Sequence, residues 1–161
     1  MTKTALEGAA KPDSASSTSG EWAFVGVIRD SEGVVVVAFA KCVAGYSDST
    51  TDECAAIREG LIFALESGFR NVEVESDSLM AVKHIKNVDS MAAMGSVIDD
   101  IVLLLNSVGS GSCCYIPRAV NMAAHTLARR AFAFSVDRFW LEETPDCILD
   151  VIANDLSAAF E

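Results

Sequence analysis

Two acidic residues, a histidine and an asparagine are the side chains best placed to do chemistry in this sequence. Asp77 comes just after the alternating, strand-like segment Asn71–Glu75, and Glu53 falls in the first turn of a predicted helix. Asn121 and His125 are one helical turn apart on a later segment. Hydrolysis of a phosphodiester with two divalent ions needs carboxylates on rigid elements, and magnesium prefers carboxylate and water oxygens as ligands. The acids are therefore a candidate metal site, provided that the fold brings them together.

Each of these side chains also has an ordinary structural interpretation. A carboxylate in the first turn of a helix is favoured by the helix dipole, so Glu53 can act as a cap alone. Asp77 can cap the helix that begins at Ser78, Asn121 can cap its own helix, and His125 can be a polar residue against the sheet. The joint placement favours a site, because a crossover helix would bring Glu53 and Asp77 to one end of the sheet.

The elements that must position these residues follow the order β-β-β-α-β-α-α-β-α. Three antiparallel strands followed by a helical crossover to a parallel fourth predict an α/β fold, a mixed five-stranded sheet flanked by helices. The predicted strands are Met1–Leu6, Trp22–Ile28, Val34–Ala44, Asn71–Glu75 and Ser112–Ile116. The predicted helices run from Thr50 to a stop at Gly68, from Ser78 to Ile85, over Ser96–Ser107 and over Asn121–Phe132. Lys11–Glu21 is a predicted linker, Arg29–Gly33 a hairpin turn, and 133–161 a covering tail of one domain that spans 1–161.

Composition restricts the classes of partner. With 23 acidic and 12 basic residues the net charge is −11, so the surface on average repels phosphates and only weak nucleic-acid affinity is expected. No apolar run approaches the length of a membrane span, and no signal segment opens the chain, so we expect no membrane partner and an intracellular place, nucleus or cytoplasm.

The five cysteines are expected to be reduced thiols. No Cys-x-x-Cys pair is present, and the adjacent Cys113 and Cys114 would point to opposite faces of a strand, which is poor geometry for zinc.

Four motifs resemble the ribonuclease H-like domains of plants and their retroelements, a family associated with reverse transcriptases. That family typically shows Arg-Asp-x-x-Gly, then Ala-Glu before a helix, then Glu-Ser-Asp-Ser, and finally Pro-Arg-x-x-Asn-x-x-Ala-His-x-Leu-Ala. This chain shows matching segments, in the same order, at Arg29–Gly33, Asp52–Leu61, Glu75–Ser78 and Pro117–Ala128. The resemblance covers nearly the whole chain and implies the ribonuclease H-like fold.

The resemblance also implies roles for individual residues. Glu53 and Asp77 match the second and third acids that the family uses as metal ligands, for Mg²⁺ or Mn²⁺ in a two-metal site. His125 matches the fourth catalytic position, where a histidine can move a proton or orient the attacking water. Ser78, Arg118 and Asn121 are the candidate substrate-binding residues.

The first acid of the family departs from the pattern. Lys3–Ala9 lines up with the family's Lys-x-Asn-x-Asp-Gly-Ala strand, so Ala5 replaces the asparagine and Glu7 replaces the aspartate. We prefer Glu7 as the first acidic residue of the catalytic site, where its carboxylate would be a metal ligand. Asp13 is the alternative, although Pro12 beside it fits a central strand poorly.

The resemblance implies cleavage of the RNA strand of an RNA–DNA hybrid, recognised by shape and 2′-hydroxyl contacts. The altered first acid and the acidic surface favour an alternative, a weak or inactive domain that serves as a nucleic-acid-binding or protein-interaction module. A third interpretation, based on charge alone, is an acidic α/β protein with no nucleic-acid role.

Overall fold

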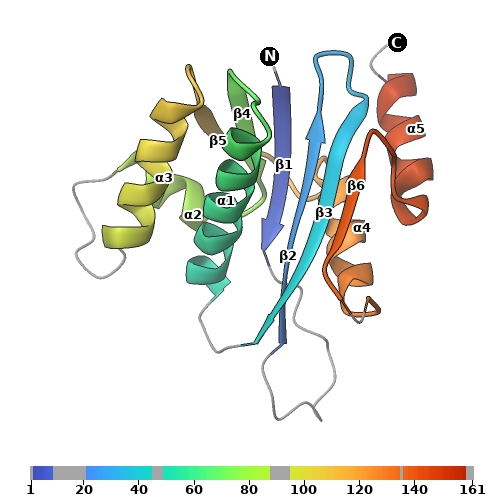
Figure 1. Ribbon diagram of the computed structural model, residues 1–161, viewed down its shortest axis with the longest axis horizontal. Coiled ribbons are helices and arrows are strands. Elements are labelled where there is room, and N and C mark those ends of the chain that lie inside the picture. The colour runs from blue at the N-terminus through green and yellow to red at the C-terminus, as the bar shows by residue number, and fades with distance from the viewer. Residues whose placement is uncertain (1, 9–20, 45–48, 88–94, 135, 159–161) are drawn as a thin grey trace.

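A single mixed sheet forms the centre of the protein. The computed structural model describes residues 2–8, 21–44, 49–87, 95–134 and 136–158. Its six strands lie in the order β5-β4-β1-β2-β3-β6 (Figure 1). The strands β1 (Thr2–Gly8), β2 (Glu21–Arg29) and β3 (Val35–Ala44) are antiparallel neighbours, whereas β4 (Val72–Ser76) and β5 (Ser112–Tyr115) continue the sheet beside β1 in parallel. The predicted α/β architecture is confirmed.

The sixth strand lies in the tail that was expected only to cover the sheet. β6 (Arg138–Leu141) pairs antiparallel with β3, from Val37 to Ala40. Its side chains do not alternate between buried and exposed positions, so the sequence carried no strand signal. The pairing satisfies the outer backbone groups of β3, which would otherwise form an open edge. After β6 come a short 3₁₀ helix, Asp146–Ile148, and α5 (Leu149–Ala158), both within the segment that was predicted only as a covering tail.

Helices pack on both faces of the sheet and define two separate cores. On one face, α1 (Ser49–Glu66), α2 (Leu79–Lys86) and α3 (Gly95–Ser107) bury large side chains, among them Phe39, Ile57, Leu61 and Ile101. On the other face lies α4 (Met122–Ala131), as Figure 1 shows. Its small residues Ala123, Ala124 and Ala128 share a buried cluster with Ala23, Ala38 and Ala40 of the sheet. Small residues on both sides allow the α4 backbone to lie close to the sheet.

The ends of the helices agree with the local sequence. Gly68 has a φ of +80° and its N–H donates to Leu65 O, while Phe69 N–H donates to Ala64 O, so α1 ends with a left-handed glycine as predicted. α1 begins at Ser49, one residue before the predicted start at Thr50. Among the described residues no helix is long and apolar enough to cross a membrane.

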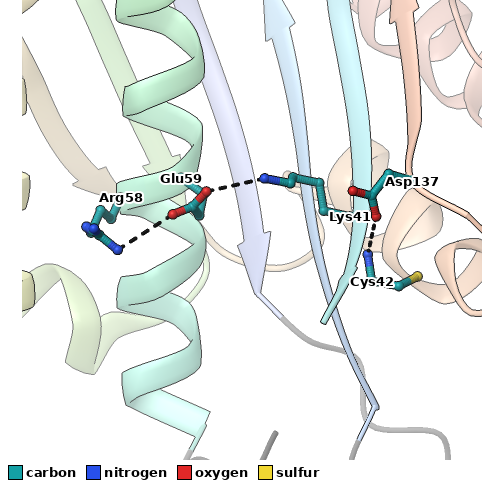
Figure 2. A network of polar contacts seen from close by, with 5 residues as sticks. All are labelled: Lys41, Cys42, Arg58, Glu59 and Asp137. Carbon is teal, nitrogen blue, oxygen red and sulfur yellow. Dashed lines mark hydrogen bonds and ion pairs between the residues drawn. The ribbon is translucent and has the colours of Figure 1, made fainter. Parts of the chain in front are cut away.

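Polar contacts tie α1 to the sheet and to α3. Figure 2 shows Lys41, from β3, reaching across the sheet towards Glu59 of α1, with an Nζ–Oε2 distance of 3.5 Å. Arg58 of α1 lies 3.6 Å from Glu59 and 2.9 Å from Asp100 of α3. These partly exposed pairs add little free energy of folding, so the buried face of α1 holds the helix in place.

The cysteines are free thiols, as predicted, and they differ in environment. Cys113 and Cys54 are buried, Cys114 and Cys147 are half-buried, and Cys42 is exposed. Cys113 is buried and Cys114 is not, which confirms that adjacent residues of β5 point to opposite faces. Burial above all, with a smaller contribution from the neighbouring Cys114, raises the pKa of Cys113 to about 12.

We expect an alkylating reagent at pH 8 to label Cys42 first and Cys113 far more slowly in the folded protein. The thiolate is the reactive form, and burial keeps Cys113 protonated well above pH 8, so its labelling should be about a hundredfold slower or more. Mass spectrometry of timed samples measures both rates. The chain unfolded in guanidinium is the control, in which the two rates should converge. Equal rates in the folded protein would contradict the burial of Cys113.

Candidate functional site

Asp77 lies just beyond β4 and holds an arginine. Nε of Arg118 donates to Oδ2 of Asp77 at 2.8 Å, and the side chains are 66% and 3% exposed respectively. The helix that follows is capped by Ser78, whose Oγ accepts a hydrogen bond from Ala81 N–H at 3.3 Å. The capping role considered for Asp77 therefore belongs to Ser78. The buried carboxylate is bound to a cation instead.

The sheet register relates Asp77 to the candidate first acid. β1 and β4 run parallel with Thr2 opposite Val72 and Ala5 opposite Glu75. The pairing ends at Ala5 and Glu75, so Glu7 on β1 and Asp77 beyond β4 each follow the last paired residue of their strand by two positions. On its other side Glu7 pairs with Val25 of β2, so the backbone of Glu7 is fixed between two strands. The alternative first acid, Asp13, lies outside the described residues.

Glu53 lies early in α1, the helix that packs against β1 and joins β3 to β4. Its side chain is half-buried, whereas the preceding Asp52 is 4% exposed. Burial of Asp52 was not expected, because an acid in the first turn of a helix normally faces solvent.

Asn121 stands at the start of α4 but does not cap it with its side chain. It is 1% exposed, and neither Oδ1 nor Nδ2 has a hydrogen-bond partner among the described residues. The expected side-chain cap is therefore wrong. Main-chain bonds hold the residue: its N–H lies 3.0 Å from Arg118 O and 3.2 Å from Pro117 O, and its carbonyl accepts from His125 N–H at 3.0 Å.

Asn121→Leu should raise the free energy of unfolding by about 1 kcal/mol or more. A buried amide without partners carries a desolvation cost of about 1–3 kcal/mol, and an apolar group of similar size removes that cost. Urea unfolding measures the change, with Asn106→Leu on the exposed side of α3 as the matched control. A variant less stable than the parent would show that the amide is satisfied. A stabilised variant with lower activity would identify Asn121 as a functional residue kept at a cost in stability.

His125 lies one helical turn after Asn121, on the second turn of α4, and is half-buried. Its neighbours Ala124 and Leu127 pack against the sheet, so the backbone of this turn is well anchored. The backbone therefore places His125 on the face of the sheet that carries α4.

An open pocket of about 490 Å³ lies against the start of α4. Its wall combines the β2–β3 hairpin, Glu75, Asn121 and the end of α5. Arg29 crosses this wall and pairs with Asp155 at 2.9 Å. This ion pair could not be predicted from local patterns, because its two residues come from opposite ends of the chain.

A second group of acids lies on β4. Glu73 and Glu75 alternate with the buried Val72 and Val74, so they point away from the α1 core. Their carboxylates and the Cys114 thiol lie within 4.8 Å of one another, which is close enough for shared metal binding. These residues were not among the predicted ligands. Alternation along β4 shows that Glu73 and Glu75 share a face of the sheet. It does not show that β5 is the neighbouring strand that brings Cys114 beside them.

Comparisons with known proteins give a consistent result. A family model described as reverse transcriptase-like matches residues 11–131. The matched segment contains Glu53, Asp77 and His125, and it also contains Asp13, whereas Glu7 lies before it. A search of curated proteins finds no match.

Solved structures show the same fold at low identity. Ribonuclease H1 from the halophilic archaeon Halobacterium salinarum is 22% identical, with a TM-score of 0.71, over 82% of this chain and 97% of that one. LC11-RNase H1 in complex with an RNA/DNA hybrid is 18% identical, with a TM-score of 0.68, over 83% and 97%. The protease-reverse transcriptase of prototype foamy virus is 13% identical, with a TM-score of 0.59, over 82% of this chain and 20% of that one.

Proposed function

Because the chain belongs to the reverse transcriptase-like family and has the ribonuclease H fold, we propose that it is a metal-dependent endonuclease that cleaves the RNA strand of RNA–DNA hybrids. The observation that supports the proposal is the parallel pairing of β1 and β4, which ends at Ala5 and Glu75, two residues before Glu7 and Asp77 respectively. Both acids follow the same end of this parallel strand pair and would therefore be available to one site.

The residues present fit a hard divalent cation. Carboxylates are the donors that Mg²⁺ and Mn²⁺ prefer. Asp77 is held at the end of a strand and already binds one positive group, the Arg118 guanidinium. Glu7, Glu53 and Asp77 would hold the metals, which supply activation of water and stabilisation of the leaving oxygen when bound.

The remaining residues act on the substrate and on the proton. His125 is placed on the second turn of α4, where its imidazole would accept or return a proton during attack on the phosphate. Arg118 lies on the turn that leads into α4, and Ser78 follows Asp77 directly, so these two would contact the nucleic acid beside the acids. Asn121 is 1% exposed and would support the turn from beneath. Arg118 is suited to a phosphate, because its guanidinium can form two parallel hydrogen bonds.

The proposed substrate is a hybrid duplex recognised by its shape. LC11-RNase H1, which shares the fold, was solved with an RNA/DNA hybrid. Shape and 2′-hydroxyl contacts need few positive charges, which suits a chain with a net charge of −11. The same charge predicts weak affinity that falls further with added salt.

Cleavage of an end-labelled RNA–DNA hybrid tests the proposal. With Mg²⁺ or Mn²⁺ we expect cuts in the RNA strand only, and none with chelator. Duplexes of DNA alone and of RNA alone serve as substrate controls. Absence of cleavage by folded protein in both metals would contradict the enzymatic function.

A second function is favoured by two features of the site. Glu7 stands where the family that this chain resembles has an aspartate. Arg118 Nε donates a hydrogen bond to Oδ2 of Asp77, which engages one of the oxygens that a metal would need. Both are expected of a weak or inactive domain retained as a nucleic-acid-binding or protein-interaction module. Such a module would bind a hybrid with the same affinity with and without Mn²⁺, whereas a metal-dependent enzyme would bind it more tightly with Mn²⁺. Calorimetric titration measures the two affinities.

A further inference from the structure

We propose that Arg118 exchanges between Asp77 and a substrate phosphate, and thereby couples nucleic-acid binding to metal binding. The inference rests on the proposed function, because it assigns Asp77 as a metal ligand. It adds a role for Arg118 beyond contact with substrate. Arg118 would be a positioning residue that controls when the acid becomes available.

The contact itself gives the first step of the argument. Arg118 Nε lies 2.8 Å from Asp77 Oδ2, on a carboxylate that is only 3% exposed. A divalent ion binding this oxygen would stand within about 2 Å of it and would meet the guanidinium as a like charge. In its observed position, Arg118 therefore opposes metal binding at Asp77.

The environment of Arg118 gives the second step. Its side chain is 66% exposed although its charge is paired, so a phosphate can reach it from solvent. A phosphate offers the guanidinium a two-pronged, charge-assisted contact that replaces the carboxylate. The chain has a net charge of −11, so its surface on average repels a phosphate. An arginine beside the acids would supply the local positive charge that holds the phosphate there.

The loop carrying Arg118 gives the third step, because its backbone is already fixed. Ile116 N–H donates to Ser76 O at 2.9 Å, which ties the loop to the end of β4. Pro117 O accepts from Val120 N–H at 2.8 Å, and Arg118 O accepts from Asn121 N–H at 3.0 Å. The exchange would therefore proceed by movement of the Arg118 side chain while the backbone of the loop stays in place.

Thermodynamic linkage makes the consequence reciprocal. If a phosphate removes Arg118 from Asp77, nucleic acid tightens metal binding, and metal tightens nucleic-acid binding by the same factor. Couplings of this kind typically amount to about 5- to 150-fold. We expect about tenfold here, because the arginine is largely exposed.

Calorimetric titration of the full chain with Mn²⁺ tests the coupling, with and without a hybrid whose 2′-O-methylated RNA strand resists cleavage. The parent should bind Mn²⁺ about tenfold more tightly with the hybrid. Arg118→Ala should bind Mn²⁺ tightly without hybrid and show no further gain. Arg129→Ala, on the last turn of α4, removes the same charge and should keep the coupling of the parent. Arg118→Gln provides the same test should the alanine variant not fold.

The outcomes separate this inference from the proposed function. If Asp77→Asn abolishes Mn²⁺ binding while Arg118→Ala keeps the coupling of the parent, the exchange is wrong and the metal site stands. If Asp77→Asn binds Mn²⁺ as the parent does, the assigned site is wrong and both proposals fail. Folded parent that binds no Mn²⁺ in either condition overturns both as well.

A metal-free measurement adds a second readout. Asp77→Asn removes the charged carboxylate that holds Arg118 at Asp77, so it should tighten hybrid binding in chelator by about tenfold. The same substitution in an Arg118→Ala background should have a much smaller effect, which a double-mutant cycle quantifies. If Asp77→Asn changed the affinity for the hybrid equally with and without Arg118, the change would come from general charge repulsion. That outcome would overturn the exchange.

Discussion

Asp77→Asn should reduce hybrid cleavage by about a thousandfold or more while leaving the fold intact. An amide cannot supply the negative charge that holds a divalent ion, and the loss of metal removes several kcal/mol of transition-state stabilisation, at 1.36 kcal/mol per factor of ten. The fold should tolerate the change, because asparagine has the same shape and the lost ion pair involves a largely exposed arginine. Single-turnover cleavage and thermal unfolding measure the two effects separately.

The control for this prediction is Asp150→Asn. Asp150 is an exposed acid in the first turn of α5, and its replacement changes the net charge by the same amount. We expect cleavage by this variant within about twofold of the parent, in line with the small effect of surface changes. If Asp77→Asn retained activity comparable to the control, Asp77 would not be a metal ligand.

Glu7→Asp should increase cleavage by about a hundredfold. The extra methylene of glutamate displaces the carboxylate by roughly 1 Å, and a displacement of that size can cost about a hundredfold when the geometry is tight. The backbone of Glu7 pairs with Val25 of β2 and runs beside β4, so β1 cannot shift to compensate. Cleavage rates at saturating Mg²⁺ measure the gain.

The alternative first acid provides the companion experiment. Asp13→Asn should leave the cleavage rate unchanged if Glu7 is the ligand. A rate that instead collapses in Asp13→Asn, with no gain in Glu7→Asp, would transfer the assignment to Asp13.

Much of the fold was predictable because short-range patterns determine it. The apolar runs of β2 and β3, the alternation of β4 and the glycine after α1 each depend on neighbours within a few residues. β6 was not predictable, because four mostly exposed residues become a strand only when the edge of β3 is present. β propensity depends on such tertiary context.

The candidate site divides in the same way. The motif Glu75–Ser78 identified Asp77 as an acid at the end of a strand, and the structure confirms its position. It did not identify the partner, because Arg118 lies 41 residues further along the chain. The sequence also did not reveal that the Asn121 side chain fails to cap its helix. Residue type predicts a preference for capping, but it does not predict that this amide is buried without a partner.

The sequence alone determined the order of the elements from β1 to α4, the mixed sheet, the reduced cysteines and the family, because periodicity, turn chemistry and motif order are local properties of the chain. Only the tertiary structure decided which charges meet: Arg118 on Asp77, Arg29 on Asp155, and Glu73 and Glu75 beside Cys114. The physical reason is that a side chain's partner depends on strand register and on how loops return to the sheet. A shift of one residue in register turns a side chain to the opposite face.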